Sequence, residues 1–208
     1  MLENECGTSV VGSLGFHVEL LKGSAIEPYV EQMIDFRLKY FRVFPYLCDD
    51  TREEEMGSVR RYIDSPTGHV LVLKDKNKNF GGFLTGVSIS ESSYSSEFSA
   101  VLKCPEKAFY IGEMIFAESF RGRDGIQKCF EYFHLIKEMG YASVCCITVQ
   151  RAADHPLKPA RYRDVSSLCK VLGFAKIEQT ITIPWSVIQS DGAALLMDNV
   201  MNIWVRDL

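Results

Sequence analysis

The chain has 208 residues, 47% of them hydrophobic and 24% charged, a size that suits one globular domain with a full-sized core. Its net charge of −4 argues against nucleic acid as the main partner, because binding to a phosphate backbone needs a basic field. No apolar run approaches the roughly 20 residues that span a bilayer, and the N-terminus lacks the layout of a signal peptide. We therefore expect a soluble, cytoplasmic protein with no membrane partner.

The seven cysteines have no metal-type spacing and are odd in number, which favours reduced thiols over a disulfide framework. We therefore expect no metal site. Nothing in the sequence indicates an oligomeric state.

Regular structure is expected from residue 16 onward, after a flexible N-terminal arm over residues 1–15. Alternating apolar residues predict a strand over residues 16–23. A helix should follow, because Ser24 and Glu27 have capping-box spacing. Its apolar stripe contains one charged member, Arg37, and Pro45 should lie beyond its end.

A second capping box, formed by Thr51 and Glu54, predicts a second helix that ends near Gly68. The glutamates at residues 53–55 are expected to complement the dipole of this helix. Two strands, over residues 69–75 and 80–89, then flank a polar turn and indicate a hairpin. The serine-rich residues 90–99 are expected to form a loop.

The most informative stretch, residues 110–126, reads YIGEMIFAESFRGRDGI and joins an apolar strand to an Arg/Gly-rich turn that opens a helix. Unpaired N–H groups in the first helical turn, the helix dipole and the cations of Arg121 and Arg123 all favour a phosphate or pyrophosphate. Gly122 and Gly125 would let such a ligand approach the backbone. A solvated strand-to-helix turn is the alternative.

The chain beyond this turn completes the order of elements. The apolar face of the helix is predicted to carry Ile126, Cys129, Phe130, Phe133 and Ile136. Residues 143–149 are typical of a buried parallel strand, and a helix over residues 164–172 and closing strands over residues 176–185 and 201–208 should follow. This order predicts a mixed α/β sheet whose central βαβ unit carries the anion turn.

Several segments, taken in this order, resemble one known family. The turn FRGRDGI resembles the acyl-CoA pyrophosphate loop of the GNAT superfamily of N-acetyltransferases. Residues 167–177, SLCKVLGFAKI, resemble its short helix, Leu-Gly-Phe turn and following strand. The segments FRVFPYL, QRAADHPLKPARYR, ITIPW and NIWVRDL look like an uncharacterised subgroup. The resemblance implies a single GNAT-like domain over residues 16–208, with a central mixed sheet of about seven strands flanked by helices.

The loop departs from the superfamily's pattern, which reads Arg/Gln-x-x-Gly-x-Gly/Ala. Counted from Arg121 without a gap, the two small-residue positions hold Asp124 and Ile126. A one-residue insertion places Gly125 and Gln127 there instead.

The resemblance also implies acetyl-CoA as the acyl donor, held where the fourth and fifth strands splay apart. Its pantetheine would pair with the main chain of Met114, Ile115 and Phe116. Its pyrophosphate would lie on the turn formed by Arg121, Gly122, Arg123, Asp124, Gly125, Ile126 and Gln127.

Transfer to an amine needs that amine deprotonated, and a well-placed base contributes roughly 10²- to 10⁴-fold. Glu113 in the central strand is the candidate base, and a structural glutamate paired with Lys or Arg is the alternative. Tyr162 is the candidate acid, although Cys169 lies nearer the position of the superfamily's tyrosine. A thiolate can also leave with only water nearby. His155 is a candidate relay, with an architectural role as the alternative.

Four further residues, Phe41, Phe44, Pro45 and Tyr46, are candidates for a wall of the acceptor site, and core packing is the alternative. Two function classes follow. The first is an acetyl-CoA-dependent N-acetyltransferase acting on a primary amine of a small molecule or peptide, which Glu113 favours. The second is a non-catalytic acyl-CoA-binding or interaction module, which the altered loop and the missing tyrosine favour.

Overall fold

The computed structural model describes residues 8–11 and 16–208. Its centre is a sheet of eight strands in the order β1-β2-β3-β4-β5-β6-β8-β7. Among the described pairs, β5 and β6 run parallel and all other neighbours are antiparallel. The strands are β1 (Thr8–Val11), β2 (His17–Leu21), β3 (His69–Lys74), β4 (Phe80–Ser88), β5 (Ala108–Phe116), β6 (Ser143–Val149), β7 (Ala175–Ile188) and β8 (Ala194–Asp207).

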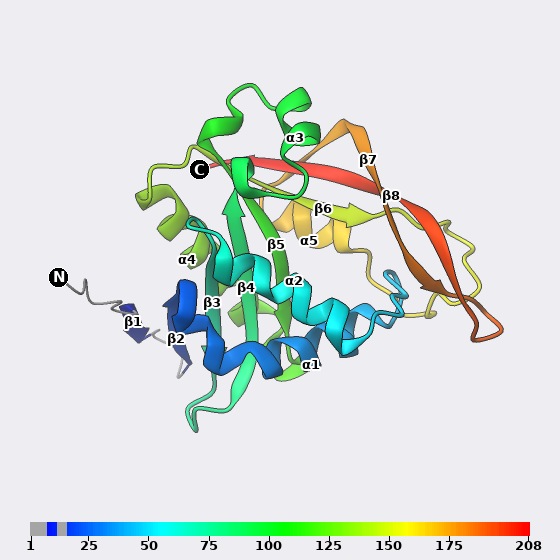
Figure 1. Ribbon diagram of the computed structural model, residues 1–208, viewed down its shortest axis with the longest axis horizontal. Coiled ribbons are helices and arrows are strands. Elements are labelled where there is room, and N and C mark those ends of the chain that lie inside the picture. The colour runs from blue at the N-terminus through cyan, green and yellow to red at the C-terminus, as the bar shows by residue number, and fades with distance from the viewer. Residues whose placement is uncertain (1–7, 12–15) are drawn as a thin grey trace.

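Helices cover both faces of this sheet, so the predicted fold class, a mixed α/β sheet flanked by helices, is confirmed (Figure 1). The α-helices are α1 (Val30–Phe41), α2 (Arg52–Asp64), α3 (Ser95–Val101), α4 (Arg123–Glu138) and α5 (Val165–Val171). The strands expected from the sequence are β2 to β8. The eighth, β1, lies within the predicted flexible arm and pairs with β2, while residues 1–7 and 12–15 of that arm lie outside the described residues.

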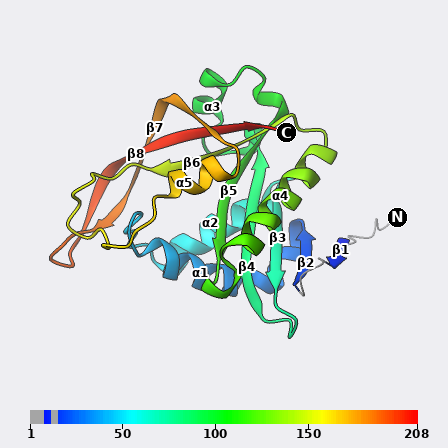
Figure 2. The ribbon, with the colours of Figure 1, turned by 180° about the vertical axis from the view of Figure 1, so that it is seen from behind.

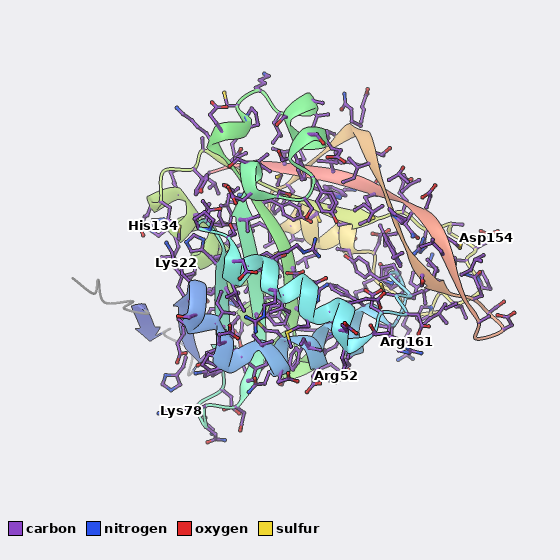
Figure 3. All side chains as sticks on the ribbon, viewed as in Figure 1. Lys22, Arg52, Lys78, His134, Asp154 and Arg161 are labelled. Atoms are coloured by element: carbon purple, nitrogen blue, oxygen red, sulfur yellow. The ribbon has the colours of Figure 1, made fainter. Side chains whose placement is uncertain are left out.

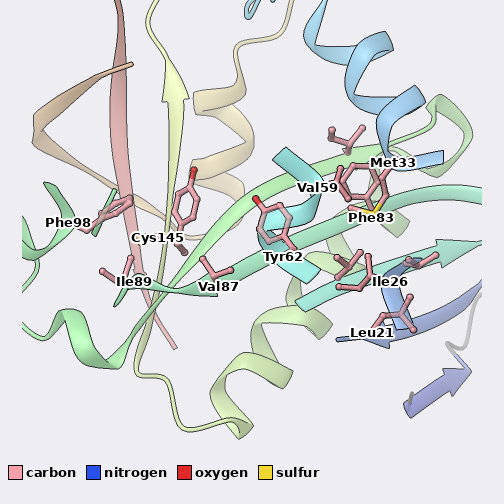
Figure 4. Close-up of a cluster of buried hydrophobic side chains, with 14 of the residues drawn as sticks. Leu21, Ile26, Met33, Val59, Tyr62, Phe83, Val87, Ile89, Phe98 and Cys145 are labelled. Atoms are coloured by element: carbon pink, nitrogen blue, oxygen red, sulfur yellow. The ribbon is translucent and has the colours of Figure 1, made fainter. Parts of the chain in front are cut away.

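Two hydrophobic cores lie on opposite faces of the sheet. One face is covered by α1 and α2, and the other by α4 and α5, which come to the front when the molecule is turned (Figure 2). Figure 4 shows the first core, where Met33 from α1 and Val59 and Tyr62 from α2 pack on Phe83 and Val87 of β4. Charged groups such as those labelled in Figure 3 lie on the outside.

The two predicted capping boxes have different outcomes. At the second, the Thr51 side chain accepts a hydrogen bond from the Glu54 N–H and the Glu54 side chain caps the Thr51 N–H, so that prediction is confirmed. At the first, the prediction is wrong about where the helix begins. The chain forms a 3₁₀ segment, η1 (Gly23–Tyr29), that contains Pro28, and α1 begins at Val30. A proline inside the segment removes a backbone donor and prevents a regular α-helix there.

Two other local expectations are also wrong. The expected serine-rich loop contains the 3₁₀ segment η2 (Ile89–Glu91) and helix α3, because Phe98 is fully buried with its ring 5.4 Å from that of Tyr110. On α4, Phe130 is 39% exposed and Tyr132 takes its expected place in the core. The Arg206 guanidinium covers part of the Phe130 ring at 5.0 Å.

The last two strands are longer than expected and form a ribbon. The β6 ladder ends at Met201 of β8, and the remaining part of β8 pairs with β7 alone. Figure 1 shows this ribbon projecting beyond the rest of the sheet. None of the helices in the described part of the chain is long and apolar enough to cross a membrane.

Candidate active site

The parallel strands β5 and β6 separate after a short ladder. Their pairing consists of Ala108 with Ser143, Phe109 with Val144, and Tyr110 with Cys145. Beyond this point β5 continues to pair only with β4, and β6 only with β8. Counted without β1, these are the fourth and fifth strands of the sheet, where the family resemblance implied a splay. The unpaired edge of β5 beyond Tyr110 can accept an extended ligand as an added strand.

A β-bulge in β5 aims Glu113 at the α1 and α2 face. Leu84 of β4 pairs with Met114 and Gly86 pairs with Ile111, so β5 contains one residue more than β4 between these pairs. An extra residue changes the alternation of side chains between the two faces. Ile111 and Met114 both pack in the core on the α4 face, whereas Glu113 faces Arg37 of α1. A regular strand would have placed Glu113 on the α4 face.

Glu113 is held by groups from three elements. Its Oε1 accepts a hydrogen bond from Arg37 Nη1, and its Oε2 accepts one from the Thr85 hydroxyl of β4. Its backbone N–H, displaced by the bulge, donates to Thr85 Oγ1 at 2.9 Å. The Tyr62 hydroxyl lies over the same bulge, since a Cβ on Gly112 would lie 1.9 Å from it. Only glycine at position 112 therefore allows this packing.

Arg37 joins two carboxylates inside the protein. It is 7% exposed, and its Nε donates to Glu55, which is 1% exposed. Burial disfavours the guanidinium, but the carboxylates of Glu113 and Glu55 raise the pKa of Arg37 above its ordinary value. Burial raises the pKa of Glu55, against the effect of Arg37. Burial, together with the nearby Glu113, also holds the pKa of Tyr62 well above its ordinary value, so its hydroxyl stays protonated.

A cavity of about 480 Å³ opens beside this cluster on the α1 and α2 face. Arg37, Tyr62 and Glu113 line it, together with residues of β6, β7 and β8. A pocket of this size is within the usual range for small-molecule sites. The cavity therefore opens a path from solvent to the largely buried Glu113 side chain.

The Arg/Gly turn lies beyond the carboxyl end of β5, at the start of α4. Gly122, the N-cap of α4, has φ 86° and ψ −141°, a conformation that essentially only glycine adopts. Gly125 is buried, and a Cβ there would lie 2.7 Å from the Phe120 carbonyl oxygen. The Ile126 N–H bonds to the Gly122 carbonyl at 3.1 Å, so the N–H groups of residues 123–125 are the ones left free by helix geometry to meet an anion.

The two arginines of the turn differ in their surroundings. Arg121 Nε donates to the Phe116 carbonyl at 3.1 Å, and its guanidinium lies 5.0 Å from the centre of the Tyr40 ring. Arg123 and Asp124 lie in the first turn of α4, with Arg123 exposed and Asp124 half-buried. The structure thus brings the turn to the same end of β5 as Met114, Ile115 and Phe116, whereas Gln127 bonds to Glu131 one turn further along α4.

The residues predicted around the proton donor lie apart from the cavity. Tyr162 packs edge-on against Phe44, with ring centres 4.7 Å apart, and His155 packs on the same ring at 5.4 Å. His155 Nδ1 accepts a hydrogen bond from the Leu157 N–H at 3.2 Å, which fits the architectural alternative. Cys169 is buried in the core on the α4 face. The described residues that line the cavity do not include Tyr162, His155 or Cys169.

Of the four residues predicted as an acceptor wall, Phe41 and Tyr46 line the cavity. Two hydrogen bonds fix the Tyr46 backbone, because its carbonyl accepts one from Arg151 at 3.0 Å and one from the Trp185 indole at 3.1 Å. Burial raises the pKa of Tyr46, and nearby acidic groups raise it further: Cys146 of β6, Tyr162, Cys169 of α5 and Glu113. Tyr46 and Glu113 line the same cavity.

Sequence reasoning missed the partners of Glu113, and it assigned Glu55 only to the helix dipole. Arg37 carried the one usable signal, since it is a charged residue within an otherwise apolar helical stripe. Glu55 and Tyr62 lie two turns apart on α2 and Thr85 lies on β4, and no local pattern in the sequence links these two elements to Glu113.

No protein-family model matches the sequence, and no curated protein matches it. Solved structures, in contrast, match over nearly the whole chain. A probable GNAT-family acetyltransferase from Chromobacterium violaceum has a TM-score of 0.58 at 11% identity, covering 99% of this chain and 93% of its own. A GCN5-related N-acetyltransferase from Kribbella flavida has a TM-score of 0.55 at 13% identity, covering 92% of this chain and 98% of its own.

A Bacillus subtilis acetyltransferase, solved in complex with CoA, has a TM-score of 0.53 at 13% identity and covers 92% of this chain and 97% of its own. At these identities the likeness concerns the fold. The protein has the fold of the GNAT acetyltransferases.

Proposed function

We propose that the protein is an acetyl-CoA-dependent N-acetyltransferase whose acceptor is a primary amine. The observation that carries this proposal is the position of Glu113, which a bulge turns into a cavity beside the opening between β5 and β6. A carboxylate at that point has access to an amine in the cavity and to an acyl group in the opening. The fold shared with acetyltransferase structures supports the same chemistry.

The chain has the features that a CoA thioester needs. The unpaired edge of β5 suits the amide groups of pantetheine, and the glycine-rich start of α4 suits a pyrophosphate. We assign Met114, Ile115 and Phe116 to the first group and residues 121–127 to the second. Acetyl-CoA would supply a thioester carbonyl that an amine can attack.

Glu113 takes the proton from the attacking amine, directly or through a water. For this it must loosen one of its two hydrogen bonds, and the one from Thr85 is exchangeable without separating the ion pair with Arg37. The new C–N bond forms as the C–S bond breaks, and the departing sulfur takes up a proton. Tyr46 lines the cavity and Tyr162 does not, so we favour Tyr46 as the donor.

A non-catalytic acyl-CoA-binding module is the second candidate. One observation favours it: both oxygens of Glu113 already accept hydrogen bonds, as they would in a purely structural ion pair.

One experiment separates the two functions. Purified protein is incubated with acetyl-CoA and a panel of primary amines, and both free CoA and acetylated amine are measured by mass spectrometry. An enzyme releases the two products in equal amounts, and Tyr46→Phe lowers the rate more than Tyr162→Phe does. Saturable binding of acetyl-CoA without amine-dependent release of CoA would instead establish the binding module.

A further inference from the structure

The lining of the cavity points to the kind of amine, and this inference rests on the proposed function. We propose that the acceptor is an aralkylamine, that is, a primary ammonium on a flat aromatic body without a carboxylate. Three features of the cavity support it: its rings, its charge and its depth.

Six aromatic residues line the cavity. They come from α1, the segment between α1 and α2, α2, the segment after η2, β5 and β7, and are Phe41, Tyr46, Tyr62, Tyr94, Tyr110 and Trp185. Tyr94 and Tyr110 pack edge to face with centres 5.7 Å apart, and Phe41 and Tyr46 are 4.9 Å apart. Paired rings on two sides favour a flat apolar body, which can stack or pack edge-on against them.

The charges that line the cavity are mostly negative. Carboxylates of Asp50, Glu54, Glu91 and Glu113 face two guanidiniums, those of Arg37 and Arg61. Arg37 is further neutralised by Glu55, which does not line the cavity. Such a lining attracts an ammonium ion and repels an acceptor that also carries a carboxylate.

Arg61 is the one feature that would favour a different acceptor. Its guanidinium bonds to the hydroxyls of Ser93 at 3.0 Å and Ser58 at 2.9 Å, and both are neutral partners. It could therefore hold the carboxylate of an amino acid. The exposed Glu91 lies in the same rim, and with Glu54 and Asp50 it outweighs this single cation.

The depth of the cavity orients the amine. Glu113 lies at the bulge in the sheet, whereas Glu54 and Glu91 are exposed at the rim. An ammonium is drawn in by the rim, and its aromatic body lodges between the rings when the nitrogen reaches Glu113. A linear polyamine would also gain charge interactions, but it has no aromatic body to pack between the rings.

The test compares three probes: phenethylamine, phenylalanine and putrescine. Phenylalanine adds only a carboxylate to phenethylamine, and putrescine keeps the charge but has no ring. Binding is measured by titration calorimetry in the presence of CoA, so that no turnover takes place. We expect phenethylamine to bind about tenfold or more tightly than either of the others. Tighter binding of phenylalanine would show that Arg61 selects the acceptor through its carboxylate. Tighter binding of putrescine would show that the aromatic rings do not contribute to the choice of acceptor. Either result overturns the proposal.

Two pairs of variants locate the effect. Tyr94→Leu should weaken the binding of phenethylamine at least threefold more than Tyr94→Phe does, because the phenylalanine keeps the ring. Glu91→Gln should weaken the binding of phenethylamine and reduce the ratio of its affinity to that of phenylalanine. Glu97 lies on α3 outside the cavity lining, and Glu97→Gln should change neither quantity.

Acetyl transfer from acetyl-CoA is then measured with the same three probes. Tight phenethylamine binding without any transfer would refute the enzyme while leaving the cavity's preference intact. Transfer that prefers phenylalanine or putrescine would support the enzyme and refute the aralkylamine.

Discussion

The two faces of the sheet differ in how completely their buried polar groups are satisfied. On the face covered by α1 and α2, Arg37 is buried with two carboxylates, and each of these groups has a partner. On the face covered by α4, the side chains of His69 and Tyr132 are buried, and neither ring nitrogen of His69 nor the Tyr132 hydroxyl has a hydrogen-bond partner among the described residues. Buried charge is costly unless it is paired. The face that holds a complete charge network is thus the face with the cavity.

The same contrast separates the two halves of the proposed site. The acceptor half depends on Glu113 and on partners from α1, α2 and β4. The donor half depends on backbone groups of one short segment, at Gly122 and Gly125. Substitutions should therefore affect stability most on the first side and ligand binding most on the second.

The strongest test of the charge network is Arg37→Met. The carboxylates of Glu55 and Glu113 would lose the cationic partner that they share among the described residues, and we expect a loss of about 3 to 5 kcal/mol in the free energy of unfolding. Chemical denaturation measures it. Arg52→Met, on the neighbouring helix with exposed partners, is the matched control and should have almost no effect. Equal, small losses in both variants would show that the network is not structurally important.

The opposite face can be tested through pH. Burial lowers the pKa of His69 from 6.5 to about 4, and the charge of Lys22 acts in the same direction. Because the unfolded chain binds this proton first, the fold should lose about 3 kcal/mol as the pH falls from 6.5 to 4. His69→Leu should remove that part of the pH dependence, whereas His134→Leu, at an exposed site on α4, should keep it. A pH profile unchanged by His69→Leu would contradict the assignment.

The donor turn can be tested through its backbone. Gly122→Ala places a side chain at φ 86°, and we expect a loss of roughly 1 to 3 kcal/mol in stability together with weaker CoA binding. Gly57→Ala lies in the ordinary helix α2 with open space around its Cβ, and it should raise stability by about 0.5 to 1 kcal/mol. Losses of the same sign at both glycines would argue against a special conformation at residue 122.

The smallest expected effect is that of Asp124→Asn. In the first turn of α4 this carboxylate should stabilise the helix by about 0.3 to 1 kcal/mol, yet beside a bound pyrophosphate it is a like charge. The variant should therefore melt slightly lower without ligand and bind CoA more tightly, with the gain shrinking in high salt. Weaker CoA binding would show that Asp124 organises the turn instead of opposing the phosphates.

Sequence reasoning reached the donor half of the site more easily than the acceptor half, for a physical reason. The glycines, arginines and helix start of residues 121–127 are contiguous, and a local pattern is enough to reveal them. The order of strands and helices was predictable on the same basis, since hydrophobic periodicity is a local signal.

The acceptor half depends on contacts between distant segments. Arg37 and Glu113 are 76 positions apart, and they meet only because a bulge reverses the direction of one side chain. The helix α3 and the burial of Tyr132 in place of Phe130 were missed for the same reason, because tertiary packing decides both.

The central claim is that Glu113 takes the proton from an amine in the cavity, and its most direct test is the rate of amine-dependent CoA release by Glu113→Gln. The variant keeps the shape of the side chain and should bind acetyl-CoA with almost unchanged affinity, measured by calorimetry. We expect turnover at neutral pH to fall by at least about tenfold and to depend less on pH. An unchanged rate would contradict the account, and a parallel loss of acetyl-CoA binding would show that Glu113 only supports the structure.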